Sequence, residues 1–125
     1  MCTINEYYKG LSVRKTIVVG LLIGLAGCAA STQQLAEDGD WSEIGYRDGL
    51  RGQTQRSYSA LNEFGQANQA DYDQGYLKGV AEYCNPDHAY QIGLSGFNYE
   101  GVCEGTEQAQ RFRMEWQRGW ADSNN

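Results

Sequence analysis

The chain has 125 residues, with 10 lysine or arginine residues against 16 aspartate or glutamate residues and a formal net charge of −6. A chain of this length has room for one small domain. After Cys28, seven basic residues face fifteen acidic ones, which argues against nucleic acid as a partner because basic patches supply most of the affinity for phosphate backbones.

The first element along the chain is a short apolar segment behind basic residues. Residues 16–27 carry no charge and follow Arg14 and Lys15, but a helix that crosses a bilayer needs roughly 20 apolar residues. The pattern is typical of a cleaved export signal. The sequence Leu25-Ala26-Gly27-Cys28 resembles the lipobox of bacterial lipoproteins, which implies cleavage before Cys28 and acylation of that cysteine. An ordinary secretory signal that leaves Cys28 unmodified is the alternative.

Acylation of Cys28 would attach the protein to a membrane. Two or more acyl chains anchor a protein stably, so we expect a covalent lipid on Cys28, no other cofactor, and residues 1–27 as a removed lipoprotein signal peptide. The next residue is Ala29, and the lipoprotein resemblance implies that a residue other than aspartate here directs export. We therefore expect an outer-membrane lipoprotein on the periplasmic side, with residues 28–39 as a flexible tether.

A single small helical domain is predicted over residues 40–122, with residues 123–125 as a tail. Asp40 followed by Glu43 forms a start that resembles a capping box, and Asn85-Pro86 provides an N-cap with proline at the first helical position. Helices are expected over residues 41–52, 58–65, 71–83 and 86–94, and from Thr106 onward.

Glycines spaced four residues apart occur in two of these helices. The sequences Gly45-Tyr46-x-x-Gly49 and Gly75-Tyr76-x-x-Gly79 remove side chains from one strip of each helix. Such strips let two backbones approach closely, as they do between membrane helices, or they make room for neighbouring aromatic rings. Both alternatives predict a contact between these two helices.

The remaining cysteines predict a disulfide. With Cys2 removed and Cys28 acylated, Cys84 and Cys103 are left as an even pair in an oxidising compartment. Residues 95–105 are rich in glycine and have no periodicity, so we expect an irregular loop held by Cys103. The expected fold class is all-α, with four or five short helices, a core rich in aromatic residues and glycine, and one disulfide-pinned loop.

Three motifs in the chain resemble those of a known family. They are Gly39-Asp40-Trp41-x-x-Ile44-Gly45-Tyr46-Arg47-Asp48-Gly49, Tyr83-Cys84-Asn85-Pro86 and Gly93-x-x-Gly96-x-x-Tyr99-x-Gly101-Val102-Cys103. From Asp40 to about Trp120 they are similar, in this order, to the domain-of-unknown-function 2799 family of small proteobacterial lipoproteins. The resemblance implies a lipoprotein signal and paired cysteines around the proline-containing segment, and the family has no assigned activity.

Residue types for catalysis or metal binding are sparse in this sequence. His88 is the one histidine of the chain, and no serine or cysteine forms a nucleophilic site with it. With Cys84 and Cys103 in a disulfide, the three or four ligands of a metal site are not available. We therefore expect no catalytic residues, no metal and no enzymatic activity.

Candidate structural or binding residues lie in the first helix and around the predicted loop. Asp48 follows Ile44 by one turn, on the side expected to be buried, and a buried carboxylate must be paired or hydrogen-bonded. We expect an arginine, a tyrosine hydroxyl or amides of residues 95–103 beside Asp48, so that it fixes this loop; ligand binding is the alternative. The candidate residues are Trp41, Tyr46, Arg47, Asp48, Tyr90, Phe97 and Tyr99.

Two functions fit these observations. The first is a structural or adaptor role in the cell envelope, in which an aromatic-rich face contacts another envelope protein. The second is a glycan-binding module, in which Tyr90, Phe97 and Tyr99 offer ring faces to the sugars of peptidoglycan or exopolysaccharide. Aromatic enrichment is also common at protein interfaces, so the sequence leaves both open.

Metabolic labelling with palmitate tests the predicted anchor. The Cys28→Ser variant lacks the thiol that would carry an acyl chain, so we expect label in the immunoprecipitated wild-type protein and none in the variant. The Cys84→Ser/Cys103→Ser double variant is the control and should keep the label. Equal labelling of wild type and Cys28→Ser would show that the lipid is not on Cys28.

Overall fold

The part of the chain that the structure describes is helical. The structure is a computed structural model that describes residues 29–125, and within this range it contains six helices and no strand. They are α1 (Thr32–Glu37), α2 (Trp41–Leu50), α3 (Tyr58–Asn62), α4 (Gln69–Tyr83), α5 (Pro86–Leu94) and α6 (Ala109–Ser123). The all-α prediction is confirmed. The predicted signal peptide and the predicted lipidation of Cys28 lie outside the described residues.

The helix that sequence reasoning did not expect is α1, and it corrects the prediction of a flexible tether over residues 28–39. Leu35 and Ala36 of α1 are buried, and the helix contacts α2. The backbone N–H of Asp40 donates to the carbonyl oxygen of Leu35 at 2.8 Å. A helix of six residues is not stable alone, so the burial of these two side chains is what orders it.

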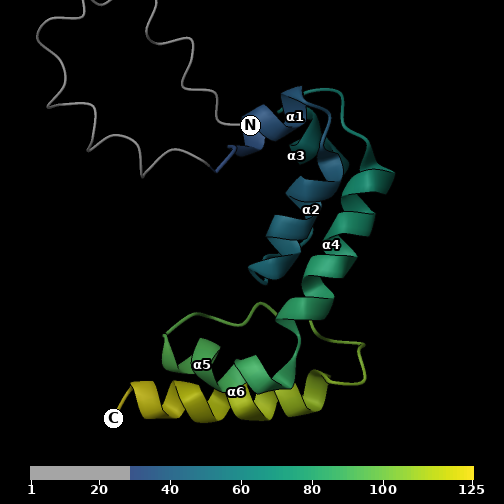
Figure 1. The fold of residues 1–125 in the computed structure, drawn as a ribbon. Coiled ribbons are helices and arrows are strands. Elements are labelled where there is room, and N and C mark those ends of the chain that lie inside the picture. The colour runs from purple at the N-terminus through teal and green to yellow at the C-terminus, as the bar shows by residue number, and fades with distance from the viewer. Residues whose placement is uncertain (1–28) are drawn as a thin grey trace, which may run out of the picture. The chain divides into compact units, whose positions relative to one another are not determined.

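Helices α2 and α4 lie side by side and run in the same direction (Figure 1). A Cβ atom on any of Gly45, Gly49, Gly75 or Gly79 would collide with the backbone of the opposite helix. Gly45 and Gly75 contact the opposite helix near the start of each helix, and Gly49 and Gly79 contact it one turn later. The two helices are therefore parallel. The predicted contact is confirmed, and its basis is close backbone approach, since the nearest atoms are backbone atoms and not rings.

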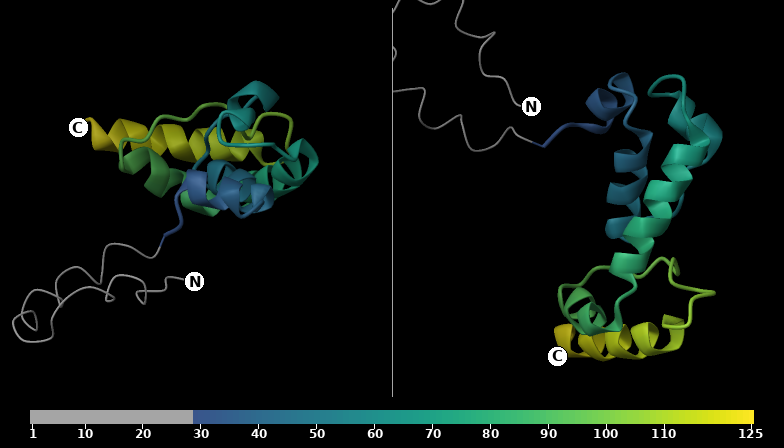
Figure 2. Two further views of the ribbon diagram at one scale, coloured as in Figure 1. Left: turned by 90° about the horizontal axis from the view of Figure 1, so that it is seen from above. Right: turned by 45° about the vertical axis from the view of Figure 1, so that its right-hand side comes forward.

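Helices α5 and α6 form a second parallel pair of the same kind, which Figure 2 shows from two further sides. A Cβ atom on Gly93 would collide with the carbonyl oxygen of Trp116, and one on Gly119 with that of Tyr90. The sequence did not predict this contact, because each of the two helices carries one glycine at the contact and not two spaced four apart.

Aromatic rings and the disulfide form the core beside the second pair. Cys84 and Cys103 are joined by a disulfide, as predicted, and both residues are buried. Phe112 is fully buried, with its ring centroid 5.3 Å from that of Tyr83 and 5.1 Å from that of Tyr99. These contacts explain how a chain with few aliphatic residues buries enough apolar surface, since each aromatic side chain covers a large area.

Several helix boundaries differ from the predicted ones, and the clearest case is the start of α6. Thr106 was expected to cap this helix, but α6 begins at Ala109 because the Thr106 hydroxyl donates to the carbonyl oxygen of Cys103 at 2.7 Å. The helix continues through Ser123, so the predicted tail is shorter by one residue. Among the described residues, no helix is long and apolar enough to span a bilayer.

Alanine substitutions test the glycine contacts of both helix pairs. In Gly79→Ala and Gly119→Ala, the gain in helix propensity of up to about 1 kcal/mol is outweighed by a clash with backbone that cannot rotate away. We expect each variant to lower the free energy of unfolding by about 1–3 kcal/mol, measured by urea denaturation. Gln74→Ala on the exposed side of α4 is the control and should not be destabilised. Unchanged stability of both glycine variants would contradict the close contact.

Candidate functional site

Asp48 lies in a buried polar cluster. This residue of α2 is only 2 % exposed. Arg56 donates to both carboxylate oxygens, from Nε to Oδ2 at 2.6 Å and from Nη2 to Oδ1 at 3.0 Å, and the Tyr72 hydroxyl donates to Oδ2 at 3.0 Å. The carboxylate is therefore both paired and hydrogen-bonded, which a buried charge requires.

The cluster fixes the segment that follows α2. The backbone N–H of Arg56 donates to the Tyr72 hydroxyl oxygen at 2.9 Å, and the Tyr76 hydroxyl donates to the carbonyl oxygen of Gln53 at 2.8 Å. The arginine and the tyrosine hydroxyl expected beside Asp48 are thus Arg56 and Tyr72. The expectation that Asp48 fixes the loop 95–103 is wrong, because its partners are Arg56 of the segment after α2 and Tyr72 of α4.

The two donors of this cluster hold their protons firmly. Burial is the main cause that raises the pKa of the Tyr72 hydroxyl, and the hydrogen bond to Asp48 is the main cause that raises the pKa of Arg56. Both groups therefore stay protonated near neutral pH and remain donors to the carboxylate. This behaviour suits a structural clamp, whereas a general acid or base needs a pKa near the working pH.

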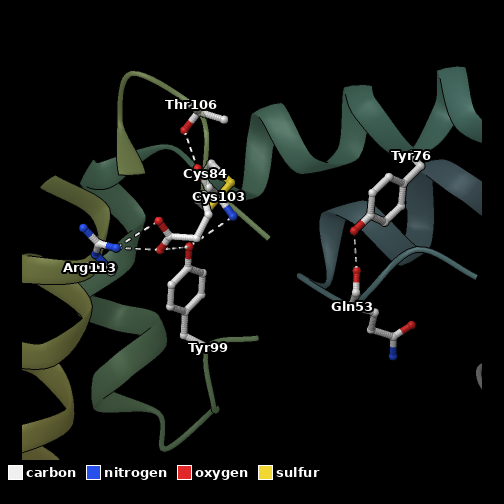
Figure 3. Close-up of a disulfide and its surroundings, with 8 residues drawn as sticks. Gln53, Tyr76, Cys84, Tyr99, Cys103, Thr106 and Arg113 are labelled. Atoms are coloured by element: carbon white, nitrogen blue, oxygen red, sulfur yellow. Dashed lines mark hydrogen bonds and ion pairs between the residues drawn. A yellow bond between two sulfur atoms is a disulfide. The ribbon is translucent and has the colours of Figure 1, made fainter. Parts of the chain in front are cut away.

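The loop of residues 95–105 is organised around Tyr99 (Figure 3). The Tyr99 hydroxyl oxygen accepts the backbone N–H of Cys103 at 3.1 Å, and its ring centroid lies 6.1 Å from that of Trp116. Burial is the main cause that raises the pKa of this hydroxyl. Tyr99 therefore holds the loop against α6 from inside, next to the disulfide.

A second anchor of the loop is Glu104, on its outer side. Both carboxylate oxygens of Glu104 accept from Nη1 of Arg113 at 2.9 Å, which ties the loop to α6. Dashed lines at Arg113 mark these bonds in Figure 3. The two side chains are about half exposed, so water screens this pair and it adds little stability. It restrains the direction of the loop more than it strengthens the fold.

Phe97 combines an exposed ring with a fixed backbone. It is 68 % exposed, yet its carbonyl oxygen accepts the indole N–H of Trp116 at 3.0 Å. Trp116 in turn stacks on Trp120 with a centroid distance of 5.3 Å, and both indoles are half-buried. The structure thus brings Phe97, Tyr99 and two tryptophans of α6 together.

Tyr90, which the glycan-binding hypothesis grouped with Phe97 and Tyr99, makes other contacts than these two residues. The Arg118 guanidinium lies 4.8 Å from the centre of the Tyr90 ring, and the Tyr90 hydroxyl donates to Asp122 at 2.9 Å. The ring lines a shallow polar groove between α5 and α6 with Pro86, Asp87, Gln91, Arg111, Glu115 and Arg118. A cation covers the ring face that a sugar would need.

The other candidates in α2 have structural partners. Trp41 is 4 % exposed and belongs to the core. The Tyr46 hydroxyl donates to Glu82 of α4 at 2.9 Å, and this bond is the main cause that raises its pKa. Arg47 pairs with Glu43 one turn earlier, at 2.7 Å. These three candidates therefore have structural roles, and Tyr46 joins α2 to α4.

Sequence reasoning missed Arg56, Trp116 and Trp120 as residues of the two sites. Arg56 lies in a segment without periodicity, so no pattern linked it to Asp48. The two tryptophans were placed on the apolar stripe of the last helix, which gave no sign that both are half-exposed. Within residues 29–125, no group of three or more histidine, cysteine, aspartate or glutamate side chains could hold a metal ion.

Comparisons with known proteins agree with the three motifs. A family model described as a protein of unknown function (DUF2799) matches residues 40–121. The uncharacterized protein YfiL of Escherichia coli (strain K12) is 33 % identical over 85 residues, which are 68 % of this chain and 69 % of that protein. No solved structure matches the chain.

Substitutions in the Asp48 cluster test its structural role. Asp48→Ala leaves the Arg56 guanidinium and the Tyr72 hydroxyl without their acceptor, so we expect a loss of about 2–3 kcal/mol in the free energy of unfolding. Tyr72→Phe should lose about 1 kcal/mol, and the double variant should lose less than the sum because the residues share one hydrogen bond. Urea denaturation measures all three.

The control for this series is Asp38→Ala, which removes an exposed carboxylate and should change stability little. A wild-type free energy of unfolding in Asp48→Ala would contradict the structural role of the cluster of Asp48, Arg56 and Tyr72.

Proposed function

We propose that this chain, which belongs to the DUF2799 family of proteins of unknown function, is a lipid-anchored structural or adaptor protein of the cell envelope. In this proposal Cys28 carries the lipid, the domain lies on the periplasmic side of the outer membrane, and the protein catalyses no reaction. Its partner is another envelope protein, which contacts the aromatic residues of the loop 95–105 and of α6.

The observation that carries the adaptor role is the exposed ring of Phe97 on a fixed backbone. Large aromatic side chains supply much of the binding energy at protein interfaces. A loop that is already ordered loses less entropy on binding than a mobile one. The Cys84–Cys103 disulfide and the Trp116–Phe97 hydrogen bond provide this order, so Phe97 presents a 68 % exposed ring at small entropic cost.

The short connection between Cys28 and α1 supports a role close to the membrane. Three residues, 29–31, separate Cys28 from the start of α1 at Thr32. An extended chain spans at most about 3.6 Å per residue, so an acylated Cys28 would lie within about 14 Å of Thr32. The start of α1 would therefore lie close to the membrane surface.

A glycan-binding module is the second candidate, favoured by the half-exposed stack of Trp116 and Trp120 beside Phe97. Ring faces of this kind can cover the apolar face of a sugar. Retention of the purified protein on isolated sacculi, with loss of retention in Phe97→Ala, would support this candidate and contradict the adaptor role.

Site-specific photocrosslinking in cells tests the adaptor role. A photoreactive phenylalanine analogue at position 97 should give one discrete crosslinked protein, because the ring would lie in the interface. The same analogue at Leu77, which is 67 % exposed on α4, is the matched control and should not capture that protein. Equal crosslinking at both positions, or none at position 97, would contradict the proposal.

A further inference from the structure

The two helix pairs are equivalent position by position. In the first repeat, residues 41–83, α2 carries Tyr46-x-x-Gly49-Leu50-x-Gly52; in the second repeat, residues 85–123, α5 carries Tyr90-x-x-Gly93-Leu94-x-Gly96. The partner helices carry Gly79-x-Ala81-Glu82 and Gly119-x-Ala121-Asp122. The chain therefore contains the same unit twice. Each unit consists of two parallel helices joined by a crossover segment, residues 51–68 in the first repeat and 95–108 in the second.

Hydrogen bonds at matching positions establish this equivalence. Tyr46 donates to Glu82 at 2.9 Å, as Tyr90 donates to Asp122 at 2.9 Å. Tyr76 donates to the carbonyl oxygen of Gln53 at 2.8 Å, as Trp116 donates to that of Phe97 at 3.0 Å. The glycines after each first helix, Gly52 and Gly96, both have positive φ and donate to the glycine three residues earlier at 3.0 Å. Similar motifs in two helices would not by themselves produce the same hydrogen bonds between residues that are far apart in the chain.

The repeats differ at the end of the second helix. In the first repeat Tyr83 places its ring on Gly52, where a Cβ would collide with the ring atoms, and Tyr76 and Val80 are buried beside it. In the second repeat the position of Tyr83 is held by Ser123.

As a result, the end of the second repeat is open. A Cβ on Gly96 would meet nothing within 4 Å. Trp116 and Trp120, which take the places of Tyr76 and Val80, are only partly buried, and Phe97 is exposed. We call the surface of Gly96, Phe97, Trp116 and Trp120 the open aromatic end.

We propose that the open aromatic end binds an aromatic side chain of a partner protein, in the place that Tyr83 fills in the first repeat. The inference rests on the proposed adaptor function, to which it adds the binding surface and the chemistry of the partner. The molecule itself supplies the reason for choosing an aromatic ring, because the equivalent surface of the first repeat is covered by a phenol ring that contacts bare glycine backbone.

The polar groups next to the open aromatic end favour a protein side chain over a sugar. Asp122 accepts from Tyr90, and the side chains of Ser123 and Asn124 both donate to the carbonyl oxygen of Trp120 at 2.8 Å. These polar side chains thus already have partners within the domain, whereas a sugar ring needs polar side chains that can bond its hydroxyls. An aromatic side chain needs apolar contact, which the two indoles and Phe97 provide.

Titration of the purified protein with N-acetyltyrosinamide, a soluble analogue of a tyrosine side chain, tests the proposal. We expect saturable shifts of the indole N–H resonances of Trp116 and Trp120 in two-dimensional NMR spectra. The buried indole of Trp41 is the internal control and should not shift. Absence of saturable shifts at both Trp116 and Trp120 would overturn the proposal, and so would shifts caused by N-acetylglucosamine oligomers but not by the tyrosine analogue.

A variant that fills the open aromatic end from within the chain provides a second test. Ser123→Tyr restores the ring of the first repeat at the equivalent position, so it should cover Gly96, abolish the shifts and raise the melting temperature by about 4–8 °C, which corresponds to about 1 kcal/mol in a domain of this size. Ser123→Ala is the matched control and should bind the probe as the wild type does. A Ser123→Tyr variant that binds the probe with wild-type affinity would overturn the proposal.

The two proposals fail in different ways. Binding of the tyrosine analogue without any crosslink from position 97 in cells would leave the site in place and contradict the adaptor role. A discrete crosslink from position 97 that persists in Ser123→Tyr would support an adaptor and overturn the open aromatic end as its binding surface.

Discussion

The contact on which the fold depends is the direct meeting of two helix backbones at glycine. Each interior glycine costs up to about 1 kcal/mol of helix propensity, and weak Cα–H···O contacts and dispersion across a seam without side chains offset this cost. Gly49 and Gly79 lie where α2 and α4 touch, and Gly93 and Gly119 lie where α5 and α6 touch. Larger side chains are therefore placed on either side of each contact. Large buried rings such as Tyr72 and Phe112 then cover the sides of these helix contacts. This explains why the core is aromatic and not aliphatic.

The two repeats hold their crossover segments by different chemistry at the same positions. Asp48 and Tyr72 of the first repeat correspond to Ile92 and Phe112 of the second. The first pair, with Arg56, fixes its crossover through charge and hydrogen bonds, and Phe112 packs against Tyr99 beside the disulfide. The second repeat has apolar residues at both positions. This is expected, because the loss of only one partner of a buried pair would leave the other partner without compensation.

Local signals in the sequence predicted most helices, because caps and periodicity act within a few residues. Asn85 accepts from the N–H of Asp87 with Pro86 at the helix start, and the glycine spacing of the first pair indicated its contact. Distant partners could not be predicted in this way: α1 depends on burial against α2, and the partnership of Arg56 with Asp48 depends on the path of the crossover. The equivalence of the repeats is only partly visible in the sequence, because aligned positions such as Tyr76 and Trp116 share a hydrogen bond and not a residue type.

A repeat array normally ends in a polar cap, because each repeat covers the apolar end of its neighbour and the last one has none. In this chain the end of the first repeat is covered by Tyr83, but the second repeat has Ser123 at the equivalent position. Phe97 stands where the first repeat has Gln53, and Trp120 stands where it has Val80. A solvent-facing end would be expected to carry the smaller or more polar residue of each pair. The larger aromatic residue is found at the exposed end instead, which is the distribution expected of a surface that is covered by a partner.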